Sequence, residues 1–301
     1  MNAKKTKKIV VLATGGTIAG LASDAAQPQN YTAGQVGVDD LLQGVAHEGI
    51  ELLSEQVAQI DSKDMSFAVW QSLLARVSHC LKQDDVQGMV ITHGTDTLEE
   101  TAYFLQTVLQ PTKPVAITCA MLPANAPDSD GPGNLKDALA WVQQPDASGV
   151  SVVCGGQIHA GNAVQKSHSH QRNPFTSQAG VTHPVALRVP SVAQVLACTH
   201  WPRVELVQNH AAADGRLVRA MMAHDAPQGW VVAGTGNGTL HHDLEAALLD
   251  AQKQGAQVLR ASRCSQGGVQ SREADVLPHA GALTAVQARV ALLMHLLAHQ
   301  A

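Results

Sequence analysis

Two apolar runs, each followed at once by a turn rich in glycine and threonine, constrain the fold of this chain more than any other feature. Residues 9–13 lead into a TGGT turn that ends at Thr17, and residues 88–92 lead into an HGTD turn that contains Thr95 and Asp96. Apolar runs bounded by glycine are typical of strands buried on both faces of a parallel sheet. Because ligands bind beyond the carboxyl ends of such strands, we expect these three side chains to lie together at one sheet edge.

Strand-like and helix-like segments alternate through the first half of the chain, and this alternation is the pattern of βαβ units. Strands are expected at residues 9–13, 57–60, 88–92 and 115–120, and helices at 39–47, 66–82, 97–109 and 134–143. A hairpin follows, in which residues 150–154 turn at Gly155 and Gly156. The expected architecture is a doubly wound α/β domain with a mostly parallel sheet.

A proline-bearing stretch with little periodicity, residues 172–203, separates this pattern from a second one. After it, strands are expected at residues 203–208, 230–233 and 258–262, and helices at 241–254 and 284–298. The sequence therefore predicts a larger N-terminal domain at residues 1–185, a linker at 186–203 and a smaller C-terminal α/β domain at 204–301.

Composition excludes several classes of function. With 301 residues, of which 45% are hydrophobic and 15% charged, the chain can bury a large core. Its net charge of -5 leaves no basic face for nucleic acid, and the 3% of aromatic residues offer few stacking platforms. No segment approaches the length of a transmembrane helix. We expect a small-molecule substrate as the partner, and neither nucleic acid nor a membrane.

The cysteines and the amino terminus indicate a cytoplasmic protein. The five cysteines are odd in number, widely spaced and mostly inside apolar runs, which predicts reduced buried thiols and not a disulfide framework or a zinc site. Residues 1–8 are basic and precede an apolar run, as in a secretion signal. That run is shorter than the apolar region of a signal and enters the TGGT turn directly, so we interpret it as a strand.

The two turns carry residue types that suit hydrolysis. A threonine hydroxyl is a weak nucleophile, so Thr17 needs a group that accepts its proton and N–H donors for the developing oxyanion. We expect the turn at residues 15–17 to supply unhindered backbone N–H groups. Thr95 and Asp96 add a second hydroxyl beside a carboxylate. Thr97 and Glu100 have the spacing of a capping box, and we assign both of them to starting a helix.

At this point a family resemblance becomes specific. Residues 13–20 (ATGGTIAG) and 91–101 (ITHGTDTLEET) resemble the two signature segments of the bacterial L-asparaginase family, in its cytoplasmic or glutaminase-asparaginase branches. Supporting matches lie at residues 30–32, 61–65, 130–132, 134–135, 166 and 234–238, so the resemblance covers almost the whole chain, although the linker is shorter than is usual in the family. It implies hydrolysis of L-asparagine to L-aspartate and ammonia through a threonine-bound acyl-enzyme, with no cofactor and no metal. A glutaminase-asparaginase of broad specificity is the alternative.

The resemblance also implies roles for individual residues. Thr17 would attack the side-chain amide, and Tyr31 would form a hydrogen bond with its hydroxyl. Thr95, Asp96 and Lys166 would form a second constellation that takes part in attack or in deacylation. An unprotonated lysine beside a hydroxyl can act as a base where desolvation lowers its pKa. Which constellation performs which step stays open.

Substrate recognition requires a carboxylate for the amino group and donors for the α-carboxylate. Asp96 suits the first role and Ser62 the second. Lys63 stands where many relatives carry Gln or Glu next to the substrate's amino group. Because an ammonium there would repel that group, we expect Lys63 to point away or to contact a carboxylate.

The resemblance implies a site shared between subunits. Asn237 would reach an active site across a subunit boundary, so a homo-oligomer is expected, a tetramer built from intimate dimers. The family's acidic residue from the neighbouring subunit should fall just after residues 262–263, where the match to the family slips by a residue or two. Glu273 and Asp275 both qualify, and we favour Glu273.

Three other classes of protein fit the sequence less well. Residues 234–238 follow a strand and precede a helix, as in dinucleotide-binding proteins, but the third glycine is misplaced and no acidic residue closes the next strand. A non-catalytic amino-acid sensor would not need Thr17 and Lys166 together. A tRNA-dependent amidotransferase subunit would carry further domains. His168 and His170 are too few for a metal site without nearby carboxylates.

Overall fold

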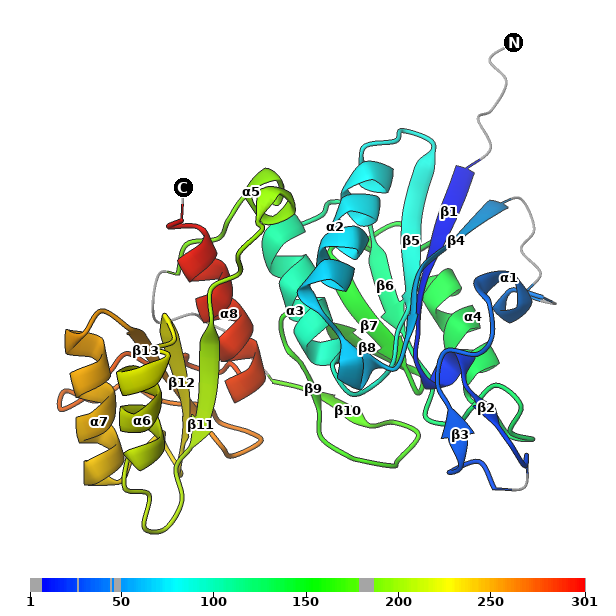
Figure 1. Ribbon diagram of the computed structural model, residues 1–301. Coiled ribbons are helices and arrows are strands. Elements are labelled where there is room, and N and C mark those ends of the chain that lie inside the picture. The colour runs from blue at the N-terminus through cyan, green and yellow to red at the C-terminus, as the bar shows by residue number, and fades with distance from the viewer. Residues whose placement is uncertain (1–6, 26, 44, 46–49, 179–186, 301) are drawn as a thin grey trace. The chain divides into compact units, whose positions relative to one another are not determined.

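The computed structural model describes residues 7–25, 27–43, 45, 50–178 and 187–300. The chain divides into two compact units, Met1–Ser177 and Gln178–Ala301, and Figure 1 shows the elements of each. The boundary expected at residue 185 lies outside the described residues. Within the described part of the chain, no helix combines the length and the apolar character that crossing a membrane requires.

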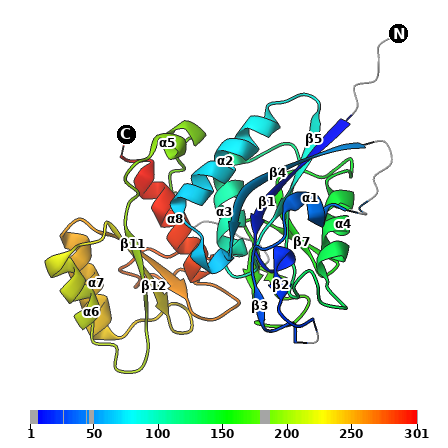
Figure 2. The same ribbon diagram turned by 45° about the vertical axis from the view of Figure 1, so that its right-hand side comes forward.

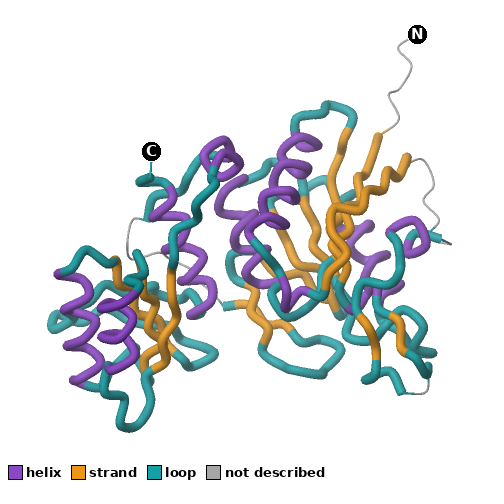
Figure 3. Tube along the Cα trace, in the orientation of Figure 1, coloured by secondary structure: helices purple, strands orange, loops and turns teal. Residues whose placement is uncertain are grey.

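The first unit is built on a six-stranded sheet, drawn as orange strands in Figure 3. Its spatial order is β4 (Ile50–Ile60), β1 (Lys7–Gly15), β5 (Val86–Thr92), β6 (Val115–Thr118), β7 (Val150–Cys154) and β8 (Gln157–Ala160). The first five strands pair in parallel, and β8 returns antiparallel through the glycine hairpin. The prediction of a mostly parallel sheet in an N-terminal α/β domain is confirmed.

Helices cover both faces of this sheet, as Figures 1 and 2 show. They are α1 (Val38–Leu41), α2 (Phe67–Leu81), α3 (Leu98–Leu109) and α4 (Gly131–Trp141). Alternate residues of β1 face opposite ways, and Ile9, Val11 and Ala13 pack in one cluster with Leu135 and Leu139 of α4. Because both faces are covered, β1, β5 and β7 read as nearly continuous apolar runs.

Two predicted elements have different bounds in the structure. The strand expected at residues 57–60 begins already at Ile50. Its first part was missed because β4 is an edge strand, and exposed polar side chains such as Glu51 and Gln56 interrupt the apolar pattern. The helix expected at 39–47 ends at Leu41, and part of its predicted span lies outside the described residues. The Gly at position 44 of the sequence disfavours a longer helix.

Short elements border the sheet. Residues 17–19 and 62–64 form 3-10 turns, and β2 (Leu21–Ala22) pairs antiparallel with β3 (Tyr31–Thr32). The proline-bearing stretch at residues 172–203 contains β10 (Phe175–Ser177), which pairs with β9 (Val164–Lys166), and α5 (Val192–Ala197). The low periodicity of the stretch hid these short elements, and Ser191 and Gln194 form a capping box that begins α5.

The second unit is a small α/β domain, as predicted. Its parallel sheet has the order β11 (Val204–Gln208), β12 (Gly229–Gly234) and β13 (Gln257–Ser262). Its helices are α6 (Arg216–His224), α7 (His242–Lys253) and α8 (Ala285–Leu297). Trp230 and Val232 pack against α6 and α7, and Figure 1 shows α8 on the other face. The sequence pattern missed α6, which buries only Val218.

The prediction of buried thiols is confirmed for three of the cysteines. Cys80, Cys119 and Cys154 are buried, and none of the five cysteines forms a disulfide. The prediction is wrong for Cys264, which is exposed. The apolar run that precedes Cys264 belongs to β13, which ends at Ser262. Cys264 itself lies beyond the strand, where the chain has left the sheet and the core.

Candidate active site

Glycine brings the two threonine turns into contact. β1 and β5 are neighbours, with Ala13 opposite Thr92, so their carboxyl ends meet at one edge of the sheet. Gly16 has a φ of 81°, and a Cβ there would lie 2.3 Å from the backbone nitrogen of Gly94. No other residue type fits a backbone approach this close. Thr17, Thr95 and Asp96 therefore emerge at the same edge of the sheet.

One expected donor is occupied. The backbone N–H of Gly16 donates to the carbonyl of Ile60 at 2.8 Å, because β1 continues to pair with β4 up to Gly15. The expectation that this N–H serves a developing oxyanion is wrong.

Thr17 lies next to Tyr31. The two hydroxyl oxygens are 2.8 Å apart, and either can donate. Thr17 begins the 3-10 turn after β1 and is almost completely buried, whereas Tyr31 is partly exposed on β3. A Cβ at Gly20 would lie 2.8 Å from the ring of Tyr31, so this glycine leaves room for the tyrosine beside the turn.

Lys166 joins the second turn from a distant part of the sequence. Its Nζ, on β9, donates to Thr95 Oγ1 at 2.9 Å and to Asp96 Oδ1 at 2.6 Å. The lysine side chain is 17% exposed and the aspartate 53%, so the amine is largely enclosed while the carboxylate remains open to solvent. The sequence-predicted group of Thr95, Asp96 and Lys166 is therefore brought together by direct contacts.

Ser62 is hydrogen-bonded to the same turn. Its buried Oγ accepts the backbone N–H of Asp96 at 3.1 Å, and a Cβ at Gly94 would lie 2.5 Å from that oxygen. The Thr97 hydroxyl donates to the Ser62 carbonyl at 2.7 Å. Thr97 is the N-cap residue of α3 but makes no side-chain capping bond, so the predicted capping box with Glu100 is wrong. The Thr97 hydroxyl, which a capping box would use as an acceptor, instead donates to the Ser62 carbonyl in the 3-10 turn at residues 62–64.

Lys63 contacts carboxylates of its own turn. Its Nζ donates to Asp61 at 2.7 Å and to Asp64 at 3.2 Å. These hydrogen bonds, the one to Asp61 first, raise the pKa of Lys63 above its ordinary value. The arrangement agrees with the expectation that Lys63 contacts a carboxylate.

His93 is a further residue of the site whose role the sequence analysis did not identify. It is fully buried, its Nδ1 lies 2.7 Å from the Gly94 carbonyl, and its Nε2 lies 3.0 Å from the Thr101 hydroxyl. Because a carbonyl only accepts, Nδ1 carries the proton, and Nε2 accepts from Thr101, which accepts from Trp70 Nε1 at 3.0 Å. Burial lowers the pKa of His93 to about 4. A neutral imidazole thus holds the backbone just before Thr95.

This burial predicts a loss of stability in acid. In the unfolded chain His93 takes up a proton near pH 6.5, but in the folded chain it does so only near pH 4, so the unfolded state binds more protons between these values. Stability is complete above pH 6.5 and falls as the pH drops towards 4. We expect His93 to lower the free energy of unfolding by about 2 kcal/mol between pH 7 and pH 5. Urea unfolding at both pH values measures this, and a His93→Gln variant with an unchanged pH slope would contradict it.

The motif at residues 130–135 fixes the loops that follow β6 and β7. Asp130 accepts the backbone N–H groups of Met121 and Leu122, at 3.0 and 2.9 Å. The Asn134 amide donates to the Cys119 carbonyl and accepts from the backbone of Gly155, each at 2.9 Å. This motif therefore acts on the backbone beside the site.

In the second unit, two predicted residues lie on connected segments. Asn237 Nδ2 donates to the Gln270 carbonyl at 2.9 Å, and its Oδ1 accepts the Gln270 N–H at 2.7 Å. Glu273 is exposed in a turn. Asp275 instead forms an ion pair of 2.8 Å with the buried Arg260. Of the two acidic candidates, Glu273 is the one whose carboxylate is open to solvent.

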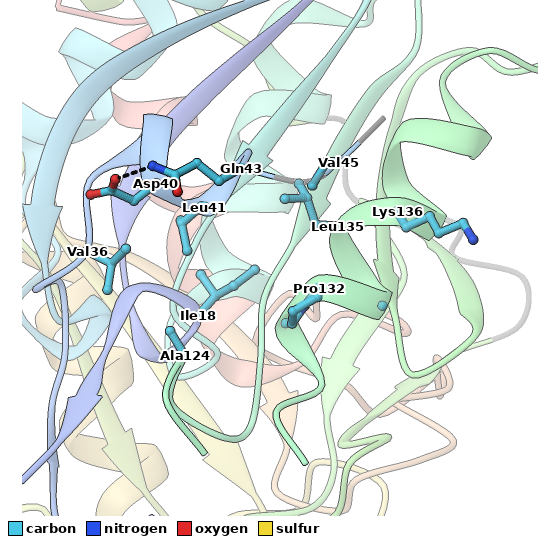
Figure 4. Close-up of a pocket in the computed structure, with 12 residues that line it drawn as sticks. Ile18, Val36, Asp40, Leu41, Gln43, Val45, Ala124, Pro132, Leu135 and Lys136 are labelled. Carbon is cyan, nitrogen blue, oxygen red and sulfur yellow. Dashed lines mark hydrogen bonds between the residues drawn. The ribbon is translucent and has the colours of Figure 1, made fainter. Parts of the chain in front are cut away.

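A cavity of about 620 Å³ lies between residues near Ile18 and the start of α4. Figure 4 shows its mostly apolar walls, with Ile18, Leu41 and Leu135 among them, and the hydrogen-bonded Asp40 and Gln43 and the amine of Lys136 at its rim. None of the sequence-predicted site residues lines it. Its apolar walls offer few groups that could bind a polar amide.

Comparisons with known proteins identify the family of this chain. Residues 8–191 match the family described as "Asparaginase, N-terminal", and residues 203–301 match "Glutaminase/Asparaginase C-terminal domain". The chain is 35% identical to the glutaminase-asparaginase of Pseudomonas fluorescens biotype A, over 90% of this chain and 79% of that protein. It is 36% identical to L-asparaginase 2 of Escherichia coli strain K12, over 96% of this chain and 88% of that protein.

A solved structure extends the likeness to the whole fold. It is the probable cytoplasmic L-asparaginase from Campylobacter jejuni, which superposes with a TM-score of 0.86 at 31% identity, over 96% of this chain and 95% of the other. The fold and the comparisons together define an amide-cleaving hydrolase of α/β architecture, with polar groups at the carboxyl ends of its parallel strands. Within that class, the chain belongs to the asparaginase/glutaminase family.

Proposed function

We propose that this enzyme hydrolyses L-asparagine to L-aspartate and ammonia through an ester formed on Thr17. The observation that carries the proposal is the contact of Lys166 with both Thr95 and Asp96, at the sheet edge where Thr17 also lies. An amine, two hydroxyls and a carboxylate at one edge provide a nucleophile, proton carriers and a group that binds an ammonium.

The reaction proceeds in two balanced steps. Thr17 Oγ1 bonds to the carboxamide carbon, the C–N bond breaks, and ammonia leaves with the proton that the hydroxyl gives up. The oxygen of a water molecule then bonds to the ester carbon, the bond from that carbon to Thr17 Oγ1 breaks, a proton of the water returns to Oγ1, and aspartate leaves. The phenol of Tyr31, 2.8 Å from the threonine, is placed to move that proton. Lys166 and Thr95 are placed to serve the step that the Thr17–Tyr31 pair does not.

Ser62 and Asp96 are suited to hold the amino-acid head group. Because Ser62 Oγ already accepts the Asp96 N–H, its own proton is available to donate to the α-carboxylate. The exposed Asp96 carboxylate can accept from the amino group while it pairs with Lys166. Lys63 is bound to Asp61 and Asp64, so its positive charge is balanced beside this site.

Ammonia release from L-asparagine, D-asparagine and L-glutamine tests the proposal. Turnover of L-asparagine supports hydrolysis, and binding of L-asparagine without ammonia would favour a non-catalytic amino-acid sensor. Comparable turnover of both L-amides would favour the broad-specificity alternative, which the name of the Pseudomonas fluorescens relative motivates.

We expect asparagine to be preferred over glutamine. Lys63 occupies the place of a residue that would accept from the substrate's amino group, so the head group depends on Asp96 and Ser62. Glutamine is one methylene longer and must shift this loosely held head group, and a displacement of about 1 Å can cost on the order of a hundredfold in rate. Steady-state kcat/KM values for the two amides measure the preference, and equal values would contradict it. Raised glutaminase activity in Lys63→Gln would support the stated cause.

The second unit supports a shared site in a homo-oligomer, which we propose to be a tetramer built from intimate dimers. Asn237 and the open carboxylate of Glu273 lie on connected segments of that unit and would complete the site of a neighbouring subunit. Monomers should then be inactive. Light scattering combined with an activity assay measures this, and an active monomer would rule the shared site out.

We also propose a cytoplasmic location. The absence of disulfides among the five cysteines supports it, as does the name of the Campylobacter jejuni relative. Another relative, from Haemophilus influenzae, is named as periplasmic. Activity in the periplasmic fraction of the source cell would refute the proposal.

A further inference from the structure

Arg260 is a buried cation of β13 that the proposed mechanism does not use. Its side chain is 7% exposed and reaches three groups from different segments. Nε donates to the Leu277 carbonyl at 3.2 Å, Nη1 donates to the Gly238 carbonyl at 3.1 Å, and Nη2 forms the ion pair with Asp275. Burying a guanidinium costs free energy of desolvation, which only well-placed partners offset. Two of the partners of Arg260 lie on the turns that carry Asn237 and Glu273, so its contacts fix the positions of those turns.

The hydrogen bond from Arg260 to the Gly238 carbonyl fixes the turn that carries Asn237. Gly238 has a φ of 73°, and a Cβ there would lie 2.8 Å from the Val269 side chain, so the turn packs directly on the next loop. The two hydrogen bonds between Asn237 and the Gln270 backbone tie the same pair of segments. One N–H and the carbonyl oxygen of the Asn237 side chain thus bind the loop that leads to Glu273.

The ion pair of Arg260 with Asp275 fixes the turn that carries Glu273. Asp275 Oδ2 accepts the backbone N–H of Arg272 at 3.0 Å, and the backbone N–H of Asp275 donates to the Arg272 carbonyl at 3.1 Å. These bonds close a turn with Glu273 inside it. The Arg272 N–H first, and the Arg260 guanidinium after it, lower the pKa of Asp275, so the carboxylate stays charged against Arg260.

We propose that Arg260, acting through Asp275, is a positioning residue that holds Glu273 and Asn237 in one fixed arrangement. It does not touch substrate. Its effect is to keep the Glu273 carboxylate where the amino group of a substrate bound in the neighbouring subunit can reach it. This inference rests on the proposed function, because it assigns the supports of the same shared site.

Asp275→Asn is the sharpest test. The amide keeps the size of the side chain and can still accept the Arg272 N–H, but it loses the charge that faces Arg260. We expect KM for L-asparagine to rise about tenfold, the range of one hydrogen bond to a charged group, while kcat changes by less than about threefold. Glu273→Gln should raise KM in the same way. Asp250→Asn, on the exposed face of α7, is the matched control and should leave both constants unchanged.

The double variant separates positioning from general stability. If Asp275 acts through Glu273, then Asp275→Asn should add little to the KM of Glu273→Gln. Independent, multiplied effects on KM would overturn the inference, and so would an unchanged KM in Asp275→Asn. If Asp275→Asn does not fold, Arg260→Lys, which keeps the charge but loses the fork of donors, replaces it with the same expected rise in KM.

Failure of the inference is distinguishable from failure of the proposed function. An active wild type with normal kinetics in Glu273→Gln overturns the inference and the role of Glu273 in a shared site, and leaves the proposed hydrolysis standing. A wild type that releases no ammonia from any amide overturns both.

Discussion

Thr17→Ala is expected to lower kcat for ammonia release by about a thousandfold or more, since it removes the oxygen that bonds to the substrate carbon. The fold should survive, because Thr17 lies in a short 3-10 turn after β1 and, among the described residues, its hydroxyl forms a hydrogen bond with Tyr31 alone. Steady-state kinetics measure the loss, and circular dichroism with thermal melting checks the fold.

Thr17→Ser is the matched control, because it keeps the hydroxyl and loses only a methyl group. It should recover much of the activity, whereas Tyr31→Phe should retain the nucleophile and lose only the phenol that faces it. Near-normal turnover by purified Thr17→Ala would remove this threonine from the chemistry. Mass spectrometry of the wild type, quenched during turnover, should find an ester on the peptide that contains Thr17.

Strands buried on both faces were predictable from local sequence. β1 and β5 are continuous apolar runs, and the sequence placed both within a few residues of their observed bounds. The first part of β4 was not predictable in this way, because one of its sides faces solvent and its polar residues break the pattern. The same reason applies to α6, whose apolar stripe buries a single residue.

Contacts at the site depend on partners that are distant in sequence. Local spacing gave Thr97 a capping role, but the Ser62 carbonyl, 35 positions away, takes its hydroxyl. The Gly16 N–H looked available, but β4 uses it. His93 is an ordinary histidine in the sequence, and only burial against Thr101 and Trp70 makes it a neutral support. Tertiary hydrogen bonds decide each of these cases, and no local pattern encodes them.

Lys166 is a site residue that local sequence does not single out. Nothing in the residues around Lys166 distinguishes it from a solvated surface lysine, and only the family resemblance singled it out. The structure brings it to Thr95 across 71 positions because β9 pairs with β10 beside the main sheet and directs the side chain to the end of β5. Its role in catalysis stays a prediction, which kinetics can test.

Thr95→Ala and Lys166→Met are each expected to lower kcat by about a hundredfold to ten-thousandfold, the range for losing a positioned proton carrier. Lys166→Met keeps the length of the side chain but removes the amine that contacts both Thr95 and Asp96, and the exposed Asp96 carboxylate can then be solvated. Lys136→Met is the matched control, because this exposed lysine lies on α4 at the rim of the apolar cavity.

The double variant tests whether Thr95 and Lys166 work as one unit. Groups that act together lose their joint effect once, so Thr95→Ala combined with Lys166→Met should be about as slow as the slower single variant. Multiplied losses would mean that the two residues act separately and would contradict the proposed constellation.

The chemical state of Thr17 in these variants shows which step Thr95 and Lys166 serve. If Lys166 and Thr95 serve deacylation, the ester on Thr17 accumulates in both single variants, because attack by the Thr17–Tyr31 pair continues while water addition is slow. If they serve attack, neither variant forms the ester, and the same mass measurement finds Thr17 unmodified.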